Sequence, residues 1–134
     1  MAGFTPNEGE ALIADIICKR VLTDRPADLE LGLFTNAAAD ETTNHAAITE
    51  PSGTGYARKT LTDGSWTGAA DVRSYAVQQF VAGAGGWTGS VYGYFIATKA
   101  GGTQRVLWME IDPAGPYTFA ANDTYDVTPN VTFA

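Results

Sequence analysis

The stretch SVYGYFIATKAGGTQRVLWMEI, residues 90–111, decides the fold of this chain because it joins two strand-forming runs through a short link. Aromatic and β-branched residues fill both runs, and these residue types favour strands. The link KAGGTQ contains two consecutive glycines, which suit a tight reversal of the chain. We therefore predict an antiparallel hairpin of residues 90–98 and 105–111. Both of its faces are apolar, as expected of strands that lie centrally in a fold or under a neighbour.

Four residues of this hairpin carry specific expectations. Glu110 is its one acidic residue, and we expect its carboxylate to accept a hydrogen bond from a tyrosine hydroxyl, a backbone group or Arg105. Tyr94 and Trp108 are predicted to lie in the core, because large aromatic side chains fill the interior of small β domains. Gly93 is expected to leave room for a cross-strand ring, which we assign to Trp108.

The rest of the chain continues the same pattern outward from the hairpin. Residues 29–34, LELGLF, alternate apolar and polar positions as a half-buried strand does. Pro129 inside the last apolar run indicates an edge strand or a bulge. About eight short strands without βαβ repeats predict a mainly β fold, an antiparallel, jelly-roll-like β-sandwich. Besides 29–34 and the hairpin, the expected strands are 55–62, 65–68, 74–82, 116–119 and 124–134.

The N-terminal segment, residues 1–22, is predicted to form an arm and the one α-helix of the fold. Thr5 and Glu8 have the spacing of a capping box, with Thr5 as the N-cap, so we expect a helix from Pro6 to about Val21. Cys18, the only cysteine, lies in this apolar segment and is expected to be buried. Apolar residues repeat there at helical spacing: Leu12, Ile13, Ile16 and Ile17.

Length and charge narrow the possible classes of protein. The 134 residues suit a single domain, 1–134, and a hydrophobic share of 45% is enough for a core. Eight basic and fifteen acidic residues give a net charge of −7, and lysine and arginine form no cluster. We therefore expect no binding to nucleic acid and none to an anionic membrane. The N-terminal residues lack the positive charge of a secretory signal, and no apolar run approaches the roughly 20 residues of a membrane span.

Residues that could carry out a reaction are few. His45 is the only histidine and lies in the polar loop of residues 36–54, where we expect it to be exposed. One histidine and one cysteine cannot make a zinc site. Glycoside hydrolysis needs two carboxylates across a cleft, and only Glu110 with Glu30 or Asp112 suggests such a pair. We therefore predict a protein that is not an enzyme and has no cofactor and no metal.

The order of several segments is the basis of a family resemblance. After the N-terminal helix come LELGLFTN (29–36), GYARKTLT (55–62), VYGYFIATKAGGTQRVLWMEI (91–111) and NDTYDVTPNVTF (122–133). This order resembles that of small structural proteins from the virions of tailed bacteriophages, over most of the chain except the loop of about 37–54. The resemblance implies a capsid cement (decoration) protein, which binds the outside of the head shell and stabilises the lattice, as a trimer.

The resemblance also implies partners and a location. The partners are the major capsid protein and further copies of this chain, without nucleic acid or membrane. The protein is made in the host cytoplasm and ends on the capsid surface of the virion. The residues expected to contact a partner are Phe4, Leu12, Ile16, Ile48, Pro51, Trp66 and Trp87.

Other roles are open for some of these residues and for the protein. Leu12 and Ile16 could instead close one open end of the sandwich. Trp66 and Trp87 flank turns, which makes them the better candidates for surface contacts. If they touch host glycans, the protein is a tail or fibre component or a receptor-binding head. A carbohydrate-active enzyme or lectin of cellular origin is the third hypothesis.

Overall fold

The two runs of the 90–111 stretch form strands β6 (Gly93–Thr98) and β7 (Val106–Ile111), which pair antiparallel as predicted. The computed structural model describes residues 2–19, 28–99 and 103–133, so residues 100–102 of the link lie outside the described residues. A bulge interrupts the register, since Ile96 faces Trp108 while Ala97 faces Val106. This irregularity turns Val106 to the face of the sheet opposite Trp108.

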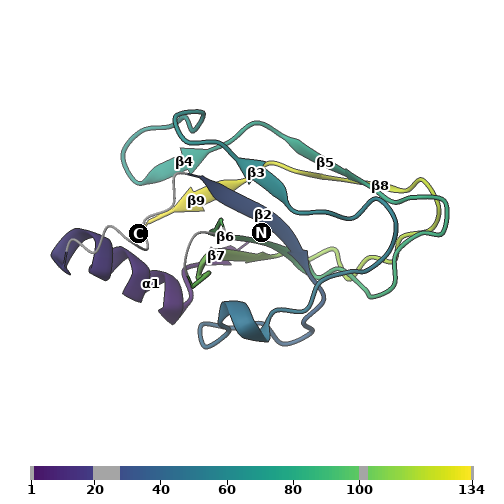
Figure 1. Ribbon diagram of the computed structural model, residues 1–134, viewed down its shortest axis with the longest axis horizontal. Helices are drawn as coiled ribbons and strands as arrows, with labels where there is room; N and C mark the ends of the chain where they lie inside the picture. The colour runs from purple at the N-terminus through teal and green to yellow at the C-terminus, as the bar shows by residue number, and fades with distance from the viewer. Residues whose placement is uncertain (1, 20–27, 100–102, 134) are drawn as a thin grey trace.

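The hairpin lies inside a five-stranded antiparallel sheet (Figure 1). All six residues of β6 are buried, because neighbours cover the sheet on both faces. The mainly β, antiparallel fold with one N-terminal α-helix confirms the predicted fold class. The strand order is β1 (Ala2–Phe4), β7, β6, β2 (Leu29–Phe34) and β3 (Lys59–Leu61).

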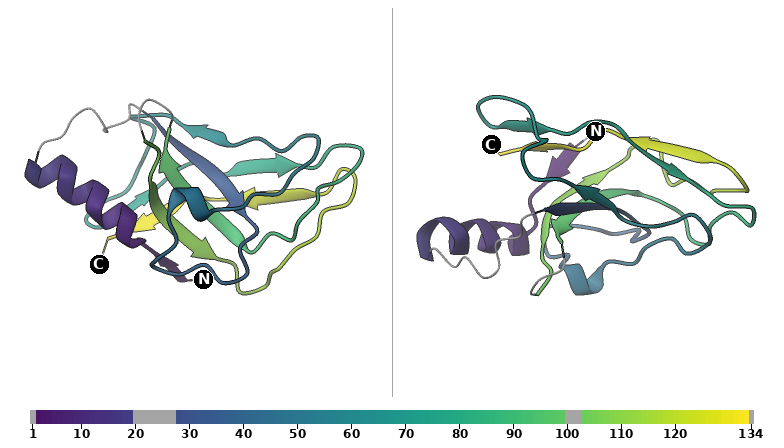
Figure 2. Two further views of the ribbon diagram at one scale, coloured as in Figure 1. Left: turned by 60° about the horizontal axis from the view of Figure 1, so that its bottom comes forward. Right: turned by 45° about the horizontal axis from the view of Figure 1, so that its top comes forward.

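Two short ribbons form a second layer over one face of this sheet (Figures 1 and 2). They are β4 (Val72–Ser74) with β9 (Asn130–Thr132), and β5 (Gln78–Val81) with β8 (Thr124–Val127). Pro129, expected at an edge or a bulge, lies between β8 and β9, where the chain changes from one ribbon to the other. Its carbonyl accepts a hydrogen bond from the Tyr75 N–H (2.9 Å). Residues 65–68 and 116–119 contribute only single bridges instead of the expected strands.

The main core fills the space between the sheet and the ribbons. Tyr94 and Trp108 lie in it, as predicted, with exposed fractions of 3% and 5%. The Tyr94 hydroxyl donates a hydrogen bond to Glu110 (2.7 Å), which confirms the role expected of that acid. The same hydroxyl lies 3.3 Å from the backbone N–H of Asn130 on β9, so it links the two layers. Burial and the Glu110 carboxylate raise the pKa of Tyr94.

A second, smaller core lies on the other face of the sheet. Residues 35–50, which we name the covering segment, cross this face and include the short 3-10 helix η2 (His45–Ala47). Ala39 and Ile48 of this segment pack on the second core, and so does Phe4 of β1. A polar loop in the sequence is therefore a layer of the fold. The buried members of the second core are Phe34, Phe95, Ala97, Val106 and Met109.

The N-terminal helix differs from its prediction in three respects. It runs over α1 (Asn7–Ala14) and continues as a π-helical turn, η1 (Asp15–Lys19); the expected end at Val21 lies outside the described residues. Pro6, not Thr5, is the N-cap, and no described side chain caps the helix, so the capping box is wrong. Gly9 and Leu12 of α1 are buried and Asp15 forms an ion pair with Arg105 (3.0 Å), whereas the end of the helix extends beyond the sheet (Figure 2). Cys18 is consequently exposed, contrary to expectation.

Glycines allow close packing at the centre of the sheet, although not as expected at Gly93. A Cβ atom there would overlap with the backbone carbonyl of Glu110 and would meet the ring of Phe34 at 3.0 Å. The expected pairing of Gly93 with Trp108 is therefore wrong. The indole of Trp108 lies against Gly3 of β1 instead, where a Cβ atom would overlap with it.

Replacing Gly93 with alanine is predicted to lower the free energy of unfolding by about 2–3 kcal/mol, because a backbone carbonyl cannot yield to the added methyl group. Gly85→Ala is the matched control, since a Cβ atom at Gly85 meets no described atom within 4 Å. Urea unfolding followed by tryptophan fluorescence measures both variants. Equal stability of the two variants would contradict the packing described for β6.

Candidate functional site

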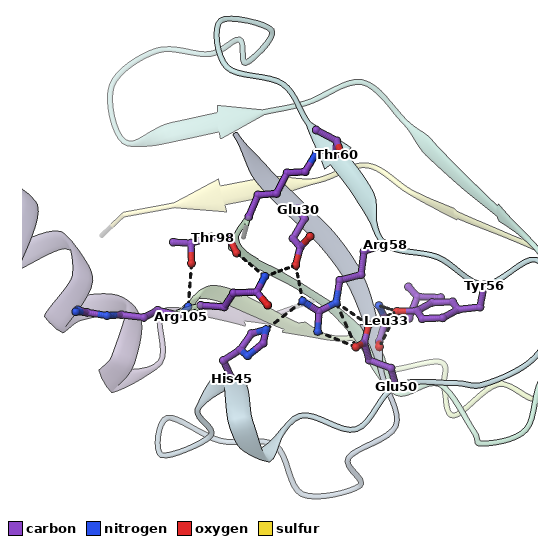
Figure 3. A network of polar contacts seen from close by, with 11 residues as sticks. Glu30, Leu33, His45, Glu50, Tyr56, Arg58, Thr60, Thr98 and Arg105 are labelled. Atoms are coloured by element: carbon purple, nitrogen blue, oxygen red, sulfur yellow. Dashed lines mark hydrogen bonds and ion pairs between the residues drawn. The ribbon is translucent and has the colours of Figure 1, made fainter. Parts of the chain in front are cut away.

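A cluster of charged side chains surrounds Arg58 under the covering segment (Figure 3). The Arg58 guanidinium binds the Glu50 carboxylate through two nitrogens, with Nε–Oε1 at 3.0 Å and Nη2–Oε2 at 2.7 Å. Its third nitrogen, Nη1, forms an ion pair with Glu30. The guanidinium carbon lies 5.0 Å from the centre of the Phe95 ring, within the range of a cation–π contact.

The alternation of β2 brings these groups to one face of the sheet. Glu30 and Gly32 point toward the covering segment, while Leu31 and Leu33 point into the main core. A Cβ atom at Gly32 would overlap with the Phe95 ring and would lie 3.1 Å from Glu50 Oε1. The missing side chain of Gly32 therefore provides the space for both the aromatic ring and the carboxylate.

Tyr56 connects this cluster to the backbone of β2. Pairing between β2 and β3 ends at Leu31 and Lys59. Beyond that point the Leu33 N–H donates to the Tyr56 hydroxyl (3.0 Å), which itself donates to Glu50 Oε1 (2.6 Å). Burial and the neighbouring Glu50 carboxylate raise the pKa of Tyr56, so it remains a neutral hydrogen-bond donor.

His45 contacts the cluster from η2. Its Nε2 atom lies 3.0 Å from Arg58 Nη1, and because a guanidinium only donates, Nε2 is the acceptor and carries no proton. Its backbone N–H donates to Glu8 Oε2 (2.8 Å), which also accepts from the Val106 N–H (2.8 Å). The expectation of an exposed histidine is therefore wrong. Burial, together with the charge of Arg58, lowers the pKa of His45.

The electrostatics of the cluster favour an ionised Glu50 carboxylate. Burial alone would raise the pKa of Glu50, but hydrogen bonds from Arg58 and Tyr56 outweigh it and hold that pKa below its usual range. The Glu50 carboxylate in turn raises the pKa of Arg58. Gln104 donates to Glu30 Oε1 (2.7 Å). Every buried side-chain nitrogen and oxygen among the described residues has a hydrogen-bond partner, so the cluster leaves no described polar atom buried and unpaired.

Glu30 and Glu110, one of the two pairs singled out for glycoside hydrolysis, lie on opposite faces of the sheet. On β6, Glu30 pairs with Ala97 and Glu110 pairs with Tyr94. Ala97 belongs to the second core and Tyr94 to the main core, so the two carboxylates point to opposite faces of the sheet. Asp112 accepts a hydrogen bond from the Tyr125 hydroxyl (2.9 Å). Within the described ranges, no three His, Cys, Asp or Glu residues gather closely enough to hold a metal ion. No described helix is long and apolar enough to cross a membrane.

The residues expected to contact a partner fall into two groups. Leu12, Pro51 and Trp87 are buried within the chain itself. The Trp87 indole donates to the Thr54 carbonyl (3.1 Å) and packs edge-on against Tyr56, so Trp87 belongs to the core and not to an exposed aromatic surface. The partly buried group is Phe4, Ile16, Ile48 and Trp66.

Trp66 lines an apolar hollow of about 290 Å³. Strands β4 and β9, which also contribute to its lining, lie at the end of the molecule that carries α1 (Figure 1). Its ring packs edge-on against Tyr75, with centroids 5.3 Å apart. Phe133, at the rim, is 41% exposed. The described residues that line the hollow are Leu29, Trp66, Arg73, Leu107, Val131 and Phe133.

Comparisons with protein-family models, with curated proteins and with solved structures found no match for this chain. The structure itself therefore defines the class: a mainly β protein with antiparallel sheets and one N-terminal helix. Its charged cluster joins the covering segment to the central sheet.

Arg58→Lys is predicted to lower the free energy of unfolding by about 2 kcal/mol, because an ammonium group cannot bind two carboxylates in the geometry of a guanidinium. Arg73→Lys is the matched control, since the Arg73 guanidinium bonds to the nearby carbonyls of Ala70 and Val72 on an exposed surface. That variant is expected to change stability by less than about 0.5 kcal/mol. Chemical unfolding measures the stability of both variants. Equal losses in the free energy of unfolding would contradict the role assigned to Arg58.

Proposed function

We propose that this protein is a capsid cement (decoration) protein of a tailed bacteriophage. It binds the major capsid protein on the outside of the head shell and acts as a homotrimer. The proposal is supported by the order of sequence segments described above and by the character of one end of the molecule. That end, which we name the helical end, comprises α1, η1, Phe133 and the apolar hollow beside it.

The apolar surface of the helical end is the observation that carries the proposal. Ile17 on η1 is 69% exposed and Phe133 is 41% exposed. Single exposed apolar side chains are ordinary on a protein surface. Here they share one end of the molecule with a hollow lined mostly by apolar side chains, and the helix extends beyond the sheet (Figure 2). Such a surface suits association with another protein.

Association explains how a domain of this kind would act. A protein that binds only the assembled lattice raises the free energy needed to open it, in proportion to the binding energy of each copy. In a trimer on a local three-fold axis, each copy would present the same surface to the next around the axis. The net charge of −7 gives no electrostatic affinity for packaged DNA, which fits a position outside the shell.

A tail component that contacts host glycans is the alternative, and it has less support. It relied on Trp66 and Trp87 as exposed aromatics. Trp87 is buried, at 8% exposure, and Trp66 packs against Tyr75. Labelling this protein on intact virions by immuno-electron microscopy separates the two functions. Label distributed over the head supports the cement function, whereas label confined to the tail refutes it.

Ile17→Asp is predicted to weaken binding to purified heads lacking this protein by about tenfold or more, since one buried aliphatic side chain contributes about 1.5–3 kcal/mol. Val77→Asp is the matched control: Val77 is also exposed, at 58%, but lies beside β5 in the second layer. Co-sedimentation of each variant with heads measures the binding. Full binding by both variants would rule out the helical end as the contact, and no binding by the unmodified protein would contradict the proposal.

A further inference from the structure

His45 lies where the covering segment is held to the rest of the protein. The neck of this segment closes on itself, since Thr35 N–H donates to the Thr49 carbonyl (2.8 Å) and the two side-chain hydroxyls lie 2.7 Å apart. The residues between, 36–48, form a flap across the second core. Away from the neck, the flap is held by the packing of Ala39 and Ile48 on the second core, by a backbone bond from Asn7 to Glu41 (2.9 Å) and by the contacts of His45.

Both contacts of His45 bind the flap to other elements. Its backbone N–H reaches Glu8 on α1, and its ring accepts a hydrogen bond from Arg58, which precedes β3. The ring contact requires a neutral imidazole, because the lone pair on Nε2 accepts the Arg58 proton. A proton from solvent on Nε2 would remove that acceptor and place an imidazolium 3.0 Å from a guanidinium.

Four charged groups face His45. Arg58 opposes a second positive charge, while Glu8 of α1, Glu30 of β2 and Glu50 of the covering segment favour one. Each of these carboxylates is already occupied. Glu8 accepts two backbone N–H groups, and Glu30 and Glu50 bind Arg58. Arg58 has the largest effect of these charges on the pKa of His45, because its guanidinium is in direct contact with the ring.

We propose that His45 is a pH-sensitive clasp: protonation of its imidazole breaks the contact with Arg58 and releases the flap from the central sheet. The side chains beneath the flap, Phe34, Phe95 and Met109, are fully buried when it is closed. Opening gives solvent or a partner access to this apolar face. The inference rests on the geometry around His45 and stands whether or not the protein binds a capsid.

The direction of the pH effect follows from linkage. Burial and the charge of Arg58 hold the pKa of His45 in the closed form below its ordinary value of 6.5. In the open form the ring is solvated and titrates near that ordinary value, so the open form binds the proton more readily. The closed form is therefore favoured above about pH 6.5, and the preference declines as the pH falls through the lower pKa of the closed form.

Hydrogen exchange of the full chain at pH 7.5 and 5.5 tests the proposal. We expect the amides of residues 36–49 to lose protection severalfold at the lower pH, after correction for intrinsic rates, while those of β6 keep theirs. His45→Gln is the matched variant, because a glutamine carbonyl still accepts from Arg58 but cannot become charged. Its flap should keep the same protection at both pH values.

A titration of the unmodified protein removes any dependence on the folding of that variant. His45 is the only histidine, so its Cε1 proton gives an isolated NMR signal. The midpoint of its titration should coincide with the midpoint of the loss of flap protection. Flap amides that stay protected throughout the titration of His45 would overturn the proposal. Equal losses of protection in His45→Gln and the unmodified protein would also overturn it, since another group would then be responsible.

Discussion

The contact of the Arg58 guanidinium with Glu30 and Glu50, above the ring of Phe95, is the interaction on which the two-sided burial of the central sheet depends. One face of this sheet is covered by the β ribbons through a large apolar core. The other face is covered by a segment that reaches the second core through Ala39 and Ile48. Because only these two of the segment's described apolar side chains pack on the second core, the charged cluster is needed to hold the covering segment in place.

The geometry of the cluster determines whether it stabilises the fold. Moving charges out of water is unfavourable, and an ion pair compensates only when its hydrogen bonds are complete. That condition is met here: Glu50 accepts from Arg58 and Tyr56, and Glu30 accepts from Arg58 and Gln104. Removal of one member would leave its partners partly buried and unpaired, which is more unfavourable than the pair itself is favourable. The cluster therefore also specifies a single position for the covering segment.

Local sequence patterns predicted the elements of this fold but not its tertiary contacts. The hairpin of 90–111 and the alternation of 29–34 depend on neighbouring residues, and the structure contains both. Glu30 and Arg58 are 28 positions apart, so only the topology brings them together. One signal was present in LELGLF: Glu30 and Gly32 occupy one face of a strand that is otherwise apolar, which indicates a polar partner above it.

The side chains whose positions were predicted wrongly also depend on contacts that are distant in sequence. The sequence pattern assigned Glu8 to a capping box, but its carboxylate binds the backbone of His45 and Val106, which are distant in sequence. Trp87 follows a glycine-rich turn, yet it is buried against Thr54 and Tyr56, which are more than 30 positions away in the sequence. Cys18 lies in an apolar run that the helix carries beyond the sheet. Each case requires knowledge of which distant segment lies alongside.

A double-mutant cycle between Arg58 and Glu50 tests most directly whether the charged cluster holds the covering segment on the sheet. The free energies of unfolding of Arg58→Met, Glu50→Gln and the double variant are compared with that of the unmodified protein. The account predicts a coupling of about 2 kcal/mol or more, as expected for a partly buried pair with two hydrogen bonds. A coupling below about 0.5 kcal/mol, the range of exposed ion pairs, would contradict it.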